Sequence, residues 1–450
     1  MPEHSGLLTD LYELTMAAGY QQTGFDARAT FELFVRHLPP HRNYLVAAGL
    51  EQALDFLENV HFTTKEIDFL RRHPVFRNIR GEFFDYLATF RFTGDVWAMP
   101  EGSLVFPGEP MLRVVAPIIE GQIMETYLLA TLSYQTMIAS KAARVVTAAK
   151  GRQVVEFGAR RAHGSQASLL AARAAAIGGC QGTSNVLAGQ QFGMETYGTQ
   201  AHSWVMAHED EMEAFAKFLD AFPEHAVLLL DTYDVRNAVK KIIAMNRKPA
   251  GVRLDSGNLA KDSQWVRREL DRVGWQDVKI FASGDLDETR IASLLAKHAA
   301  IDAFGVGTAL ATPGDAPHLN LVYKLVEVER GGIIREAAKL SAAKVTYPGR
   351  KQVFRYSAPS GEYRHDKIAL DDESGDGGER MLREVMRGGR RTTPPEAVAD
   401  SRARCLAGLA RLSRPLRQIN RAAAYPVEYS KRLEVLLEKL RRRVRRAALK

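Results

Sequence analysis

The stretch from Gly251 to Asn258 (Gly-Val-Arg-Leu-Asp-Ser-Gly-Asn) contains residue types that could bind a phosphorylated sugar. Apolar residues at 252 and 254 alternate with Arg253 and Asp255, which is the pattern of a strand with two different faces. A guanidinium can bind oxyanions through two hydrogen bonds, and a carboxylate can accept hydrogen bonds from ribose hydroxyls. In parallel α/β proteins, ligands bind where the strands end. The alternative is an Arg253–Asp255 ion pair with a purely structural role.

Two further motifs carry groups that could hold a flat anionic ring. Glu156-Phe-Gly-Ala-Arg-Arg161 places an aromatic ring and two guanidiniums at the end of a predicted strand. An aromatic face with a neighbouring guanidinium suits such a ring, because one stacks on it and the other pairs with its charge. The alternative is a core phenylalanine with solvated arginines. Gly182-Thr-Ser-Asn185 is a small polar turn whose hydroxyls and N–H groups can bind oxygen atoms.

The segment Tyr197-Gly-Thr-Gln-Ala-His202-Ser-Trp predicts a histidine at or just before the start of a helix. A phosphate on the His202 ring would meet free N–H groups there. A lone histidine is otherwise a hydrogen-bonded structural residue. Ser283-Gly-Asp285 and Gly305-Val-Gly-Thr308 end the last two predicted strands, and the last two strand–helix loops of barrels often hold a phosphate.

The elements that must position these motifs form a regular series after Gly151. Apolar runs typical of buried strands alternate with helices at roughly 20–25 residues per unit, which predicts a parallel barrel or a doubly wound sheet. The part before Ala226 is less regular, so we expect a distorted or incomplete barrel. The predicted strands are Gln153–Phe157, Ala226–Asp231, Gly251–Asp255, Val278–Ser283 and Ile301–Gly305, and the predicted helices are Val235–Met245, Leu259–Val273 and Asp287–His298.

Both flanks of this series are richer in short strands. Strands are predicted at Thr30–Val35, in three pieces over 92–117, at 323–328, and on either side of a Pro-Gly turn within 344–356. We expect a mobile acidic loop at Asp371–Gly378. The predicted helices begin after Thr9 or Asp10, with a stripe of Leu11, Leu14 and Ala18, and lie at 45–57, at 122–149 and at the C-terminus, where Leu433, Leu436, Leu437, Leu440 and Val444 form one stripe.

Composition places the 450-residue chain among ordinary globular proteins, with 46% hydrophobic and 25% charged residues. Two cysteines cannot form a disulfide framework or a zinc site, and the N-terminus lacks the pattern of a secretory signal, so we expect a cytoplasmic protein. No apolar run is long enough to span a bilayer. Residues 431–450 hold a net charge of +7 out of the total of +8, so a basic C-terminal helix could contact RNA or anionic lipid, or could present a solvated face.

Six motifs together resemble one known family. They span roughly residues 7–355 and are Thr9-Asp-Leu-Tyr-Glu-Leu-Thr-Met16, Glu156-Phe-Gly-Ala-Arg-Arg-Ala162, Gly182-Thr-Ser-Asn185, Gly198-Thr-Gln-Ala-His-Ser203, Val252-Arg-Leu-Asp-Ser-Gly257 and Phe304-Gly-Val-Gly-Thr308. In this order they resemble the type II phosphoribosyltransferases, and within them the nicotinate phosphoribosyltransferase family. The tail after about Glu362 adds nothing to the resemblance.

The resemblance implies an α/β fold, namely an irregular (β/α) barrel plus a smaller β-rich α+β domain built from both chain ends. On this reading residues 150–318 form the barrel that carries the active site, and residues 1–145 with 320–365 form the second domain. Residues 366–450 would then be a helical, basic C-terminal extension. The resemblance also implies a homodimer whose active sites are completed across the subunit interface.

Site roles follow only from matched positions. Phe157 would stack on a pyridine ring, with the partner subunit's Tyr12 on its other face, and Arg160 would help to hold the ring acid or a phosphate. His202 would be phosphorylated by ATP, and Arg253 and Asp255 would contact the ribose. The remaining implied positions are Thr183, Ser184, Ser256 and Gly257 for substrate, and Arg36, Ser283, Gly284, Gly305, Gly307 and Thr308 for phosphate.

The implied reaction transfers a phosphoribosyl group from 5-phosphoribosyl-1-pyrophosphate (PRPP) to nicotinate, with coupled ATP hydrolysis, in NAD biosynthesis. Mg²⁺ would be held mainly by substrate phosphates, without a protein metal cage. Two alternatives remain. One is nicotinamide as the substrate. Against it, the nicotinamide enzymes of this fold have an acidic residue after Gly-Thr, and this chain has Ser184 there. The other is a catalytically silent phosphate-binding or RNA-binding protein. Neither nucleic acid nor membrane is an expected partner.

Overall fold

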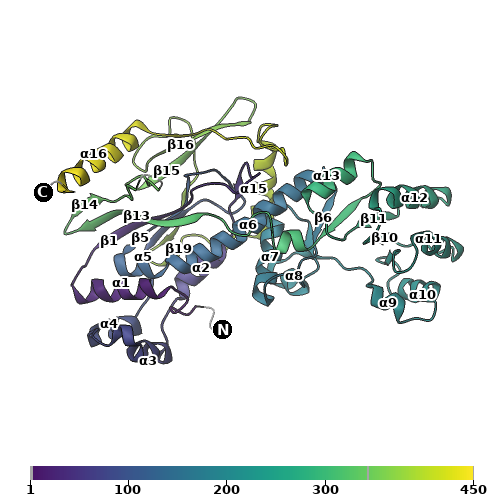
Figure 1. Ribbon diagram of the computed structural model, residues 1–450, viewed down its shortest axis with the longest axis horizontal. Coiled ribbons are helices and arrows are strands. Elements are labelled where there is room, and N and C mark those ends of the chain that lie inside the picture. Colours follow the sequence, from purple (N-terminus) through teal and green to yellow (C-terminus); the bar gives the residue numbers. More distant parts are fainter. Residues whose placement is uncertain (1–3, 342–343, 449–450) are drawn as a thin grey trace. The chain divides into compact units, whose positions relative to one another are not determined.

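The computed structural model describes residues 4–341 and 344–448, and the chain divides into two compact units (Figure 1). Unit 1 comprises Met1–Met137, His318–Ala397 and Ala407–Lys450, so both ends of the chain build it. Unit 2 comprises Ile138–Pro317 and the short segment Val398–Leu406. With the tail included, unit 1 is the larger of the two.

Unit 2 is organised around a sheet of seven parallel strands in the order β8-β7-β6-β12-β11-β10-β9. No ladder joins β8 to β9 within the described residues, so the sheet is an open half-barrel, as the irregular sequence spacing indicated. The strands are β6 (Gln153–Glu156), β7 (Gly182–Thr183), β8 (Glu195–Thr196), β9 (Val227–Leu229), β10 (Gly251–Leu254), β11 (Lys279–Ala282) and β12 (Ala303–Val306).

The helices between these strands begin at polar capping residues. The side chains of Asp234, Asn258 and Asp287 each accept a hydrogen bond from the backbone N–H three residues further on, which satisfies a donor that the helix leaves free. The helices that follow these caps match the predictions closely. Unit 2 contains α7 (Ser165–Ile177), α8 (Val186–Phe192), α9 (His202–Met206), α10 (Glu211–Ala221), α11 (Val235–Ala244), α12 (Leu259–Arg272), α13 (Glu288–Ala296) and α14 (Thr308–Ala311).

Unit 1 contains a seven-stranded sheet in the order β14-β13-β1-β5-β3-β18-β19, whose adjacent strands are antiparallel. A four-stranded sheet, β17-β15-β16-β20, and the pair β2-β4 complete it. The bounds are β1 Arg28–Val35, β2 Leu45–Val46, β3 Asp95–Ala98, β4 Leu104–Val105, β5 Pro110–Pro117, β13 Leu321–Arg330, β14 Ile333–Glu336, β15 Lys351–Ser357, β16 Tyr363–Leu370, β17 Glu379–Arg380, β18 Arg383–Arg387, β19 Arg390–Arg391 and β20 Val427–Tyr429.

Helices of unit 1 are α1 (Leu11–Gln22), α2 (Leu50–Asn59), α3 (Thr64–Arg72), α4 (Gly81–Ala88) and α5 (Ile118–Ile123), with a short 3-10 turn at Pro74–Phe76. Helix α16 (Lys431–Ala448) closes the chain, and α6 (Glu125–Ala149) and α15 (Val398–Ala410) each have residues in both units. No described helix combines the length and apolar content needed to cross a membrane.

Three predictions for the N-terminal half were wrong in detail. The helix expected at 45–57 starts only at Leu50, because Gly49 is left-handed (φ 102°) and the preceding residues pair with β4 instead. The Glu101 carboxylate then accepts hydrogen bonds from the first N–H groups of α2. The helix expected from Gln122 is split at Met124 into α5 and α6. Leu11 lies on the exposed side of α1.

The tail is less helical than the sequence pattern indicated. Residues 366–391 include most of β16 and all of β17, β18 and β19, because β16 pairs along its length with β15. The Pro-Gly turn at 348–349 joins no hairpin. The backbone N–H groups of Thr346 and Gly349 donate instead to the carbonyls of Lys339 and Val326. In the loop expected to be mobile, Asp371 accepts bonds from Arg113 and Arg380 at 3.1 and 2.9 Å. In α16 the predicted stripe is buried except at Leu436, which is half-buried, and Val444, which is exposed.

Candidate active site

The motifs that end the unit 2 strands converge on one cavity of about 310 Å³. Six of the residues singled out from the sequence line it, and they come from the ends of β6, β7 and β10 and from the start of α9. These are Phe157, Arg160, Ser184, His202, Arg253 and Asp255. Carboxyl ends of parallel strands meet at one edge of a sheet, so a single edge supplies every one of these groups.

Arg253 is the centre of a hydrogen-bond network inside this cavity. Its guanidinium donates to Asp255 Oδ1 and to Ser283 Oγ, both at 2.9 Å. It also donates to the Thr199 hydroxyl and, at 3.3 Å, to the carbonyl of Gln200. Ser283 in turn donates to Asp255. The predicted arginine and aspartate therefore do form an ion pair, and that pair lines the cavity rather than closing a buried layer.

The electrostatics of Asp255 follow from this network. Burial would raise its pKa, but the hydrogen bond from Ser283 and the positive charge of Arg253 together lower the pKa below its ordinary value. Asp255 therefore stays ionised at neutral pH and can accept hydrogen bonds from a ligand.

Two glycines allow the strand ends to approach one another. A Cβ at Gly284, where φ is +87°, would lie 1.8 Å from the carbonyl oxygen of Asp255. A Cβ at Gly305 would lie 2.4 Å from the ring of Phe157. No side chain fits at either position, so these glycines set the places of Asp255 and Phe157. Their predicted role at the phosphate is untested by this geometry.

The residue before Phe157, whose ring forms the aromatic wall of the cavity, is the buried Glu156. Glu156 accepts hydrogen bonds from the Thr183 hydroxyl at 2.6 Å and from the backbone N–H of Gly158, and burial raises its pKa. Thr183 is fully buried, so it supports the wall and leaves the neighbouring Ser184 to line the cavity. Tyr197, which the sequence analysis did not select, adds a second aromatic side chain to the lining.

His202 is the first residue of α9, as expected, but α9 is only five residues long. A helix this short adds little dipole, so it does not by itself supply the favourable environment that the sequence predicted for a phosphate. Nδ1 lies 3.2 Å from the hydroxyl of Thr232, and Nε2 lies 3.9 Å from Asp255 Oδ2. The ring thus has a positioning contact on one side and faces the aspartate on the other.

Sequence reasoning missed two further residues at this edge. Asp231 Oδ2 accepts from the backbone N–H of Asp255 at 3.1 Å and from the Ser256 hydroxyl, while its buried Oδ1 has no hydrogen-bond partner within the described chain. Gln200 is 2% exposed, and its amide nitrogen is also buried without a partner there. The available clue for Asp231 was its place at the end of the strand predicted at Ala226–Asp231.

The other ten predicted positions are not among the lining residues: Tyr12, Arg36, Thr183, Ser256, Gly257, Ser283, Gly284, Gly305, Gly307 and Thr308. Tyr12 and Arg36 belong to unit 1. Thr308 starts α14 and is exposed. Gly307 approaches the backbone of Phe157, and Gly257 adopts a left-handed conformation with φ of +75° in the turn after β10.

The cavity therefore combines two guanidiniums, aromatic faces and an ionised carboxylate. Arg160 is exposed and pairs with no carboxylate among the residues described, so its charge is available to a ligand. A flat anionic ring can stack on Phe157 beside Arg160, while Asp255 can accept hydroxyl groups from a sugar. A cavity of this volume is large enough for small ligands of this kind.

Comparisons with known proteins agree with this chemistry. A model of the nicotinate phosphoribosyltransferase (NAPRTase) N-terminal domain matches residues 7–133, and a model of the nicotinate phosphoribosyltransferase (NAPRTase) family matches residues 152–370. The chain is 46% identical over 396 residues to a nicotinate phosphoribosyltransferase of Mycobacterium tuberculosis, covering 86% of this chain and 83% of the relative. Identity to the Bacillus subtilis nicotinate phosphoribosyltransferase is 43% over 378 residues, with coverage of 82% and 76%.

Solved structures show the same likeness. The crystal structure of human nicotinic acid phosphoribosyltransferase superimposes with a TM-score of 0.84 at 30% identity, covering 96% of this chain and 99% of the human one. The nicotinate-nucleotide pyrophosphorylase of Pyrococcus furiosus gives a TM-score of 0.73 at 28% identity, with coverage of 90% and 95%.

Proposed function

Because this chain belongs to the nicotinate phosphoribosyltransferase family, we propose that the unit 2 cavity is where it joins nicotinate to the ribose of PRPP. The observation that carries the proposal is the convergence of Phe157, Arg160, Arg253 and Asp255 on one cavity at the carboxyl edge of the sheet. The ring nitrogen of nicotinate forms the new bond to the sugar as the bond to pyrophosphate breaks. No protein nucleophile is needed at the sugar.

Each side chain contributes position or charge. Phe157 stacks on the pyridine ring, and Arg160 pairs with its carboxylate. Asp255, ionised beside Arg253, accepts ribose hydroxyls and stabilises positive charge that develops on the sugar. Arg253 presents its guanidinium to the phosphate oxygens, and the turns at Gly284 and Gly307 leave backbone N–H groups for the 5′-phosphate. Orientation and charge stabilisation together supply the rate enhancement.

The residues also fit Mg²⁺, which typically takes one or two carboxylates together with substrate phosphates. Asp231 has a buried oxygen without a partner in the described chain, and its other oxygen is bonded to the backbone of Asp255, so these two aspartates would hold the ion. Mg²⁺ would neutralise charge on the pyrophosphate group.

Substrate choice tests the proposed ring site. We expect kcat/KM for nicotinate to exceed that for nicotinamide by at least about tenfold, because the amide lacks the charge that pairs with Arg160. Arg160 is exposed, so the ratio should fall short of that for a fully buried charge pair. Arg160→Gln should reduce the ratio, whereas Arg161→Gln, at a neighbouring arginine outside the lining, should leave it unchanged. Equal turnover of acid and amide by the wild-type enzyme would refute this assignment.

We further propose that ATP phosphorylates His202 and that hydrolysis of this phosphoryl group is coupled to transfer. Support comes from the geometry, since Thr232 orients the ring while Nε2 faces Asp255 in the cavity. A phosphoryl group there adds negative charge beside Arg253 and the pyrophosphate position. That charge changes the affinity for PRPP until hydrolysis resets the site.

Incubation with γ-labelled ATP is expected to give an acid-labile, base-stable label that His202→Ala abolishes. The variant should lose ATP stimulation but keep some ATP-independent transfer, because the ring and ribose contacts remain. His208→Ala is the matched control, because His208 bonds to the carbonyl of Trp204 and does not line the cavity. Protein with this change should still be labelled on His202. Fully active wild-type enzyme that never takes up label would rule out a phosphocarrier role.

The proposal includes a homodimer in which α1 of one subunit covers the cavity of the other. Apolar side chains are exposed on α1 at Leu11, Tyr12 and Met16, and in unit 2 at Val186 and Tyr233 near strand ends. These are the apolar side chains that such an interface would bury. In this arrangement the partner subunit's Tyr12 stacks on the ring and the partner's Arg36 reaches a phosphate. The proposal keeps the cytoplasmic location that the cysteine content indicates.

A further inference from the structure

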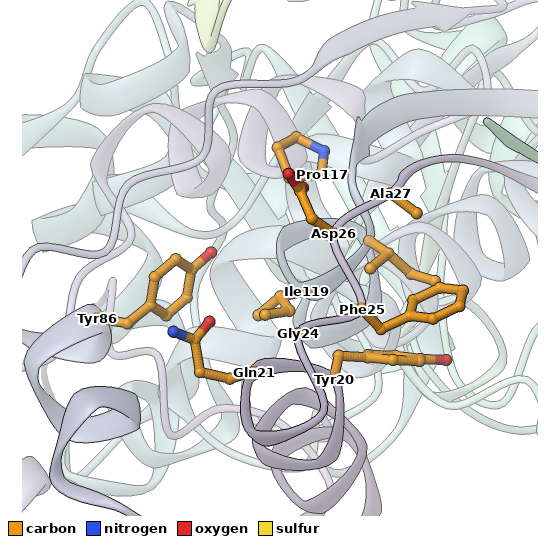
Figure 2. A pocket seen from close by; sticks show the side chains of 10 residues that line it. Tyr20, Gln21, Gly24, Phe25, Asp26, Ala27, Tyr86, Pro117 and Ile119 are labelled. Carbon is orange, nitrogen blue, oxygen red and sulfur yellow. The ribbon is translucent and has the colours of Figure 1, made fainter. Parts of the chain in front are cut away.

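Helix α1 of unit 1, which carries Tyr12, is held in different ways at its two ends. Its last turn lines a cavity of about 280 Å³, where Gln21 lies beside Tyr86 of α4 (Figure 2). Its first turn is instead hydrogen-bonded to residues around the break between α5 and α6. Tyr12 lies in this first turn, so these bonds set the place of the residue on which the proposed shared site depends.

The residue after Tyr12, Glu13, is fully buried and is the centre of this attachment. Its Oε1 accepts a hydrogen bond from the backbone N–H of Thr126 at 3.1 Å and lies 2.7 Å from the Thr126 hydroxyl. Its Oε2 contacts the hydroxyl of Thr9. Among the residues that the structure describes, no lysine or arginine pairs with Glu13, so a negative charge on it would be buried without a cation.

The protons available to these contacts are too few for an ionised Glu13. The Thr126 hydroxyl also contacts Asp10 Oδ2, at 2.9 Å. The Thr9 hydroxyl also contacts the carbonyl of Ile123, at 2.9 Å. Each hydroxyl carries one proton, so the two hydroxyls can supply only two of these four oxygen–oxygen contacts. A proton on Glu13 Oε2 supplies a third, because Thr9 can then accept from Glu13 and donate to Ile123.

The surroundings of Glu13 favour the neutral carboxyl. Burial raises its pKa to about 8, and the negative charges of Glu125 and Asp10 act in the same direction, while a hydrogen bond from Thr126 opposes them. The ordinary value for this carboxyl is 4.5, so Glu13 keeps its proton at pH 7.

The other charged and titratable groups that face the first turn of α1 come from its own segment and from α6 and β13. They are Asp10, Tyr12, Glu125, Tyr323 and Lys324. Lys324, the cation among them, lies 3.8 Å from Glu125. Tyr86 of α4 and Glu120 of α5 interact with each other instead. Ionisation of Glu13 would therefore add a negative charge near Glu125 and Asp10 without adding a cation.

We propose that Glu13 is a neutral carboxylic acid that positions Tyr12 for the ring site of the partner subunit, by attaching the first turn of α1 to the start of α6. The inference rests on the proposed function, in which Tyr12 stacks on nicotinate in the other subunit. Glu13 itself touches no substrate. Loss of its proton removes the bond that it donates to Thr9 and brings like charges together, so the first turn loosens and the ring site weakens.

Glu13→Gln and Glu13→Ala test this role in the full-length enzyme. A glutamine has the shape of the neutral acid and an N–H donor for Thr9, so Glu13→Gln should keep kcat/KM for nicotinate within about threefold of wild type at pH 7. Glu13→Ala should lower it by about tenfold and leave the KM for PRPP unchanged, because the attachment is lost and only the ring contact is displaced. Asp68→Asn, which removes an exposed carboxylate of α3, is the matched control and should behave as wild type.

A pH profile separates positioning from a purely structural role. With a pKa of about 8, about a tenth of Glu13 stays neutral at pH 9, so wild-type kcat/KM for nicotinate should fall about tenfold from pH 7 to pH 9. Glu13→Gln cannot ionise. The ratio of its kcat/KM to that of wild type should therefore rise about tenfold over this range, and the ratio cancels the other groups that titrate.

Thermal melting tests the proton on Glu13 without an activity assay. Because the pKa in the folded protein lies above the ordinary value, the folded state holds the proton more tightly than the unfolded state. Stability therefore falls as pH rises from 4.5 to about 8, and is level above that. Glu13→Gln lacks this loss, so its Tm should rise relative to that of wild type by at least about 2 °C between pH 5 and pH 8.

The proposal is overturned if the Tm difference between Glu13→Gln and wild type stays constant from pH 5 to pH 8, because Glu13 is then not a neutral acid in the fold. It is also overturned if the Tm difference changes while the two kcat/KM profiles stay parallel, since the proton then has no effect on the ring site. Failure of the proposed function has a different signature: Tyr12→Ala would keep wild-type kcat/KM for nicotinate, while the Tm difference would still report the proton on Glu13.

Discussion

Replacing Arg253 by methionine is expected to lower kcat/KM by at least about a hundredfold, since losing a single preorganised donor typically costs that much. The change removes the hydrogen bonds that the guanidinium makes to Asp255, Ser283, Thr199 and Gln200. It leaves Asp255 ionised without its cation, and it removes the charge proposed to meet the phosphates of PRPP. Steady-state kinetics with PRPP as the varied substrate measure the loss.

The control for this experiment is Arg272→Met, which removes an exposed arginine of α12 that pairs with Glu269. It should keep wild-type activity. Arg253→Lys separates charge from geometry, because a lysine supplies the charge but cannot make several of these bonds at once. It is expected to fall between methionine and wild type. Arg253→Met protein that is folded and retains more than about half of the wild-type kcat/KM would refute the role of this residue.

Subunit mixing gives the second large effect. Tyr12→Ala and Asp255→Ala enzymes should each be nearly inactive if the partner's Tyr12 completes a site that contains Asp255. After subunit exchange, half of the dimers are mixed and each holds one intact site, so activity should return to about a quarter of wild type. Activity is measured before and after exchange, and the extent of exchange is followed with differently tagged subunits.

The matched control mixes Asp255→Ala with Arg253→Met, two changes in the same unit of the chain. Every site in such a mixed dimer carries one of the defects, so no activity should return. Demonstrated exchange without recovery in the Tyr12 and Asp255 mixture would show that the sites are not shared. Recovery in the control mixture would show that these two residues serve different sites.

Much of unit 2 could be predicted from local pattern. Val252 and Leu254 alternate with Arg253 and Asp255, and polar caps such as Asn258 stand directly after the strands, so each strand and helix has its own local cause. The convergence of Arg253 with Phe157 also followed, because carboxyl ends of parallel strands must meet at one edge. The two-residue strands β7 and β8 could not be predicted, because two residues display no period.

The sequence by itself therefore determined five of the seven strands of unit 2, the three helices between the later ones, and most of the side chains that meet at the strand ends. Only the tertiary structure decided that Asp231 bonds to the backbone of Asp255 and that Glu101 caps α2 from a distant loop. It also decided that the segment 363–370 pairs as a strand. The physical reason is that periodicity and capping act between residues close in sequence. Pairing across a sheet, and the partner that a buried carboxylate finds, depend on segments that only folding brings together.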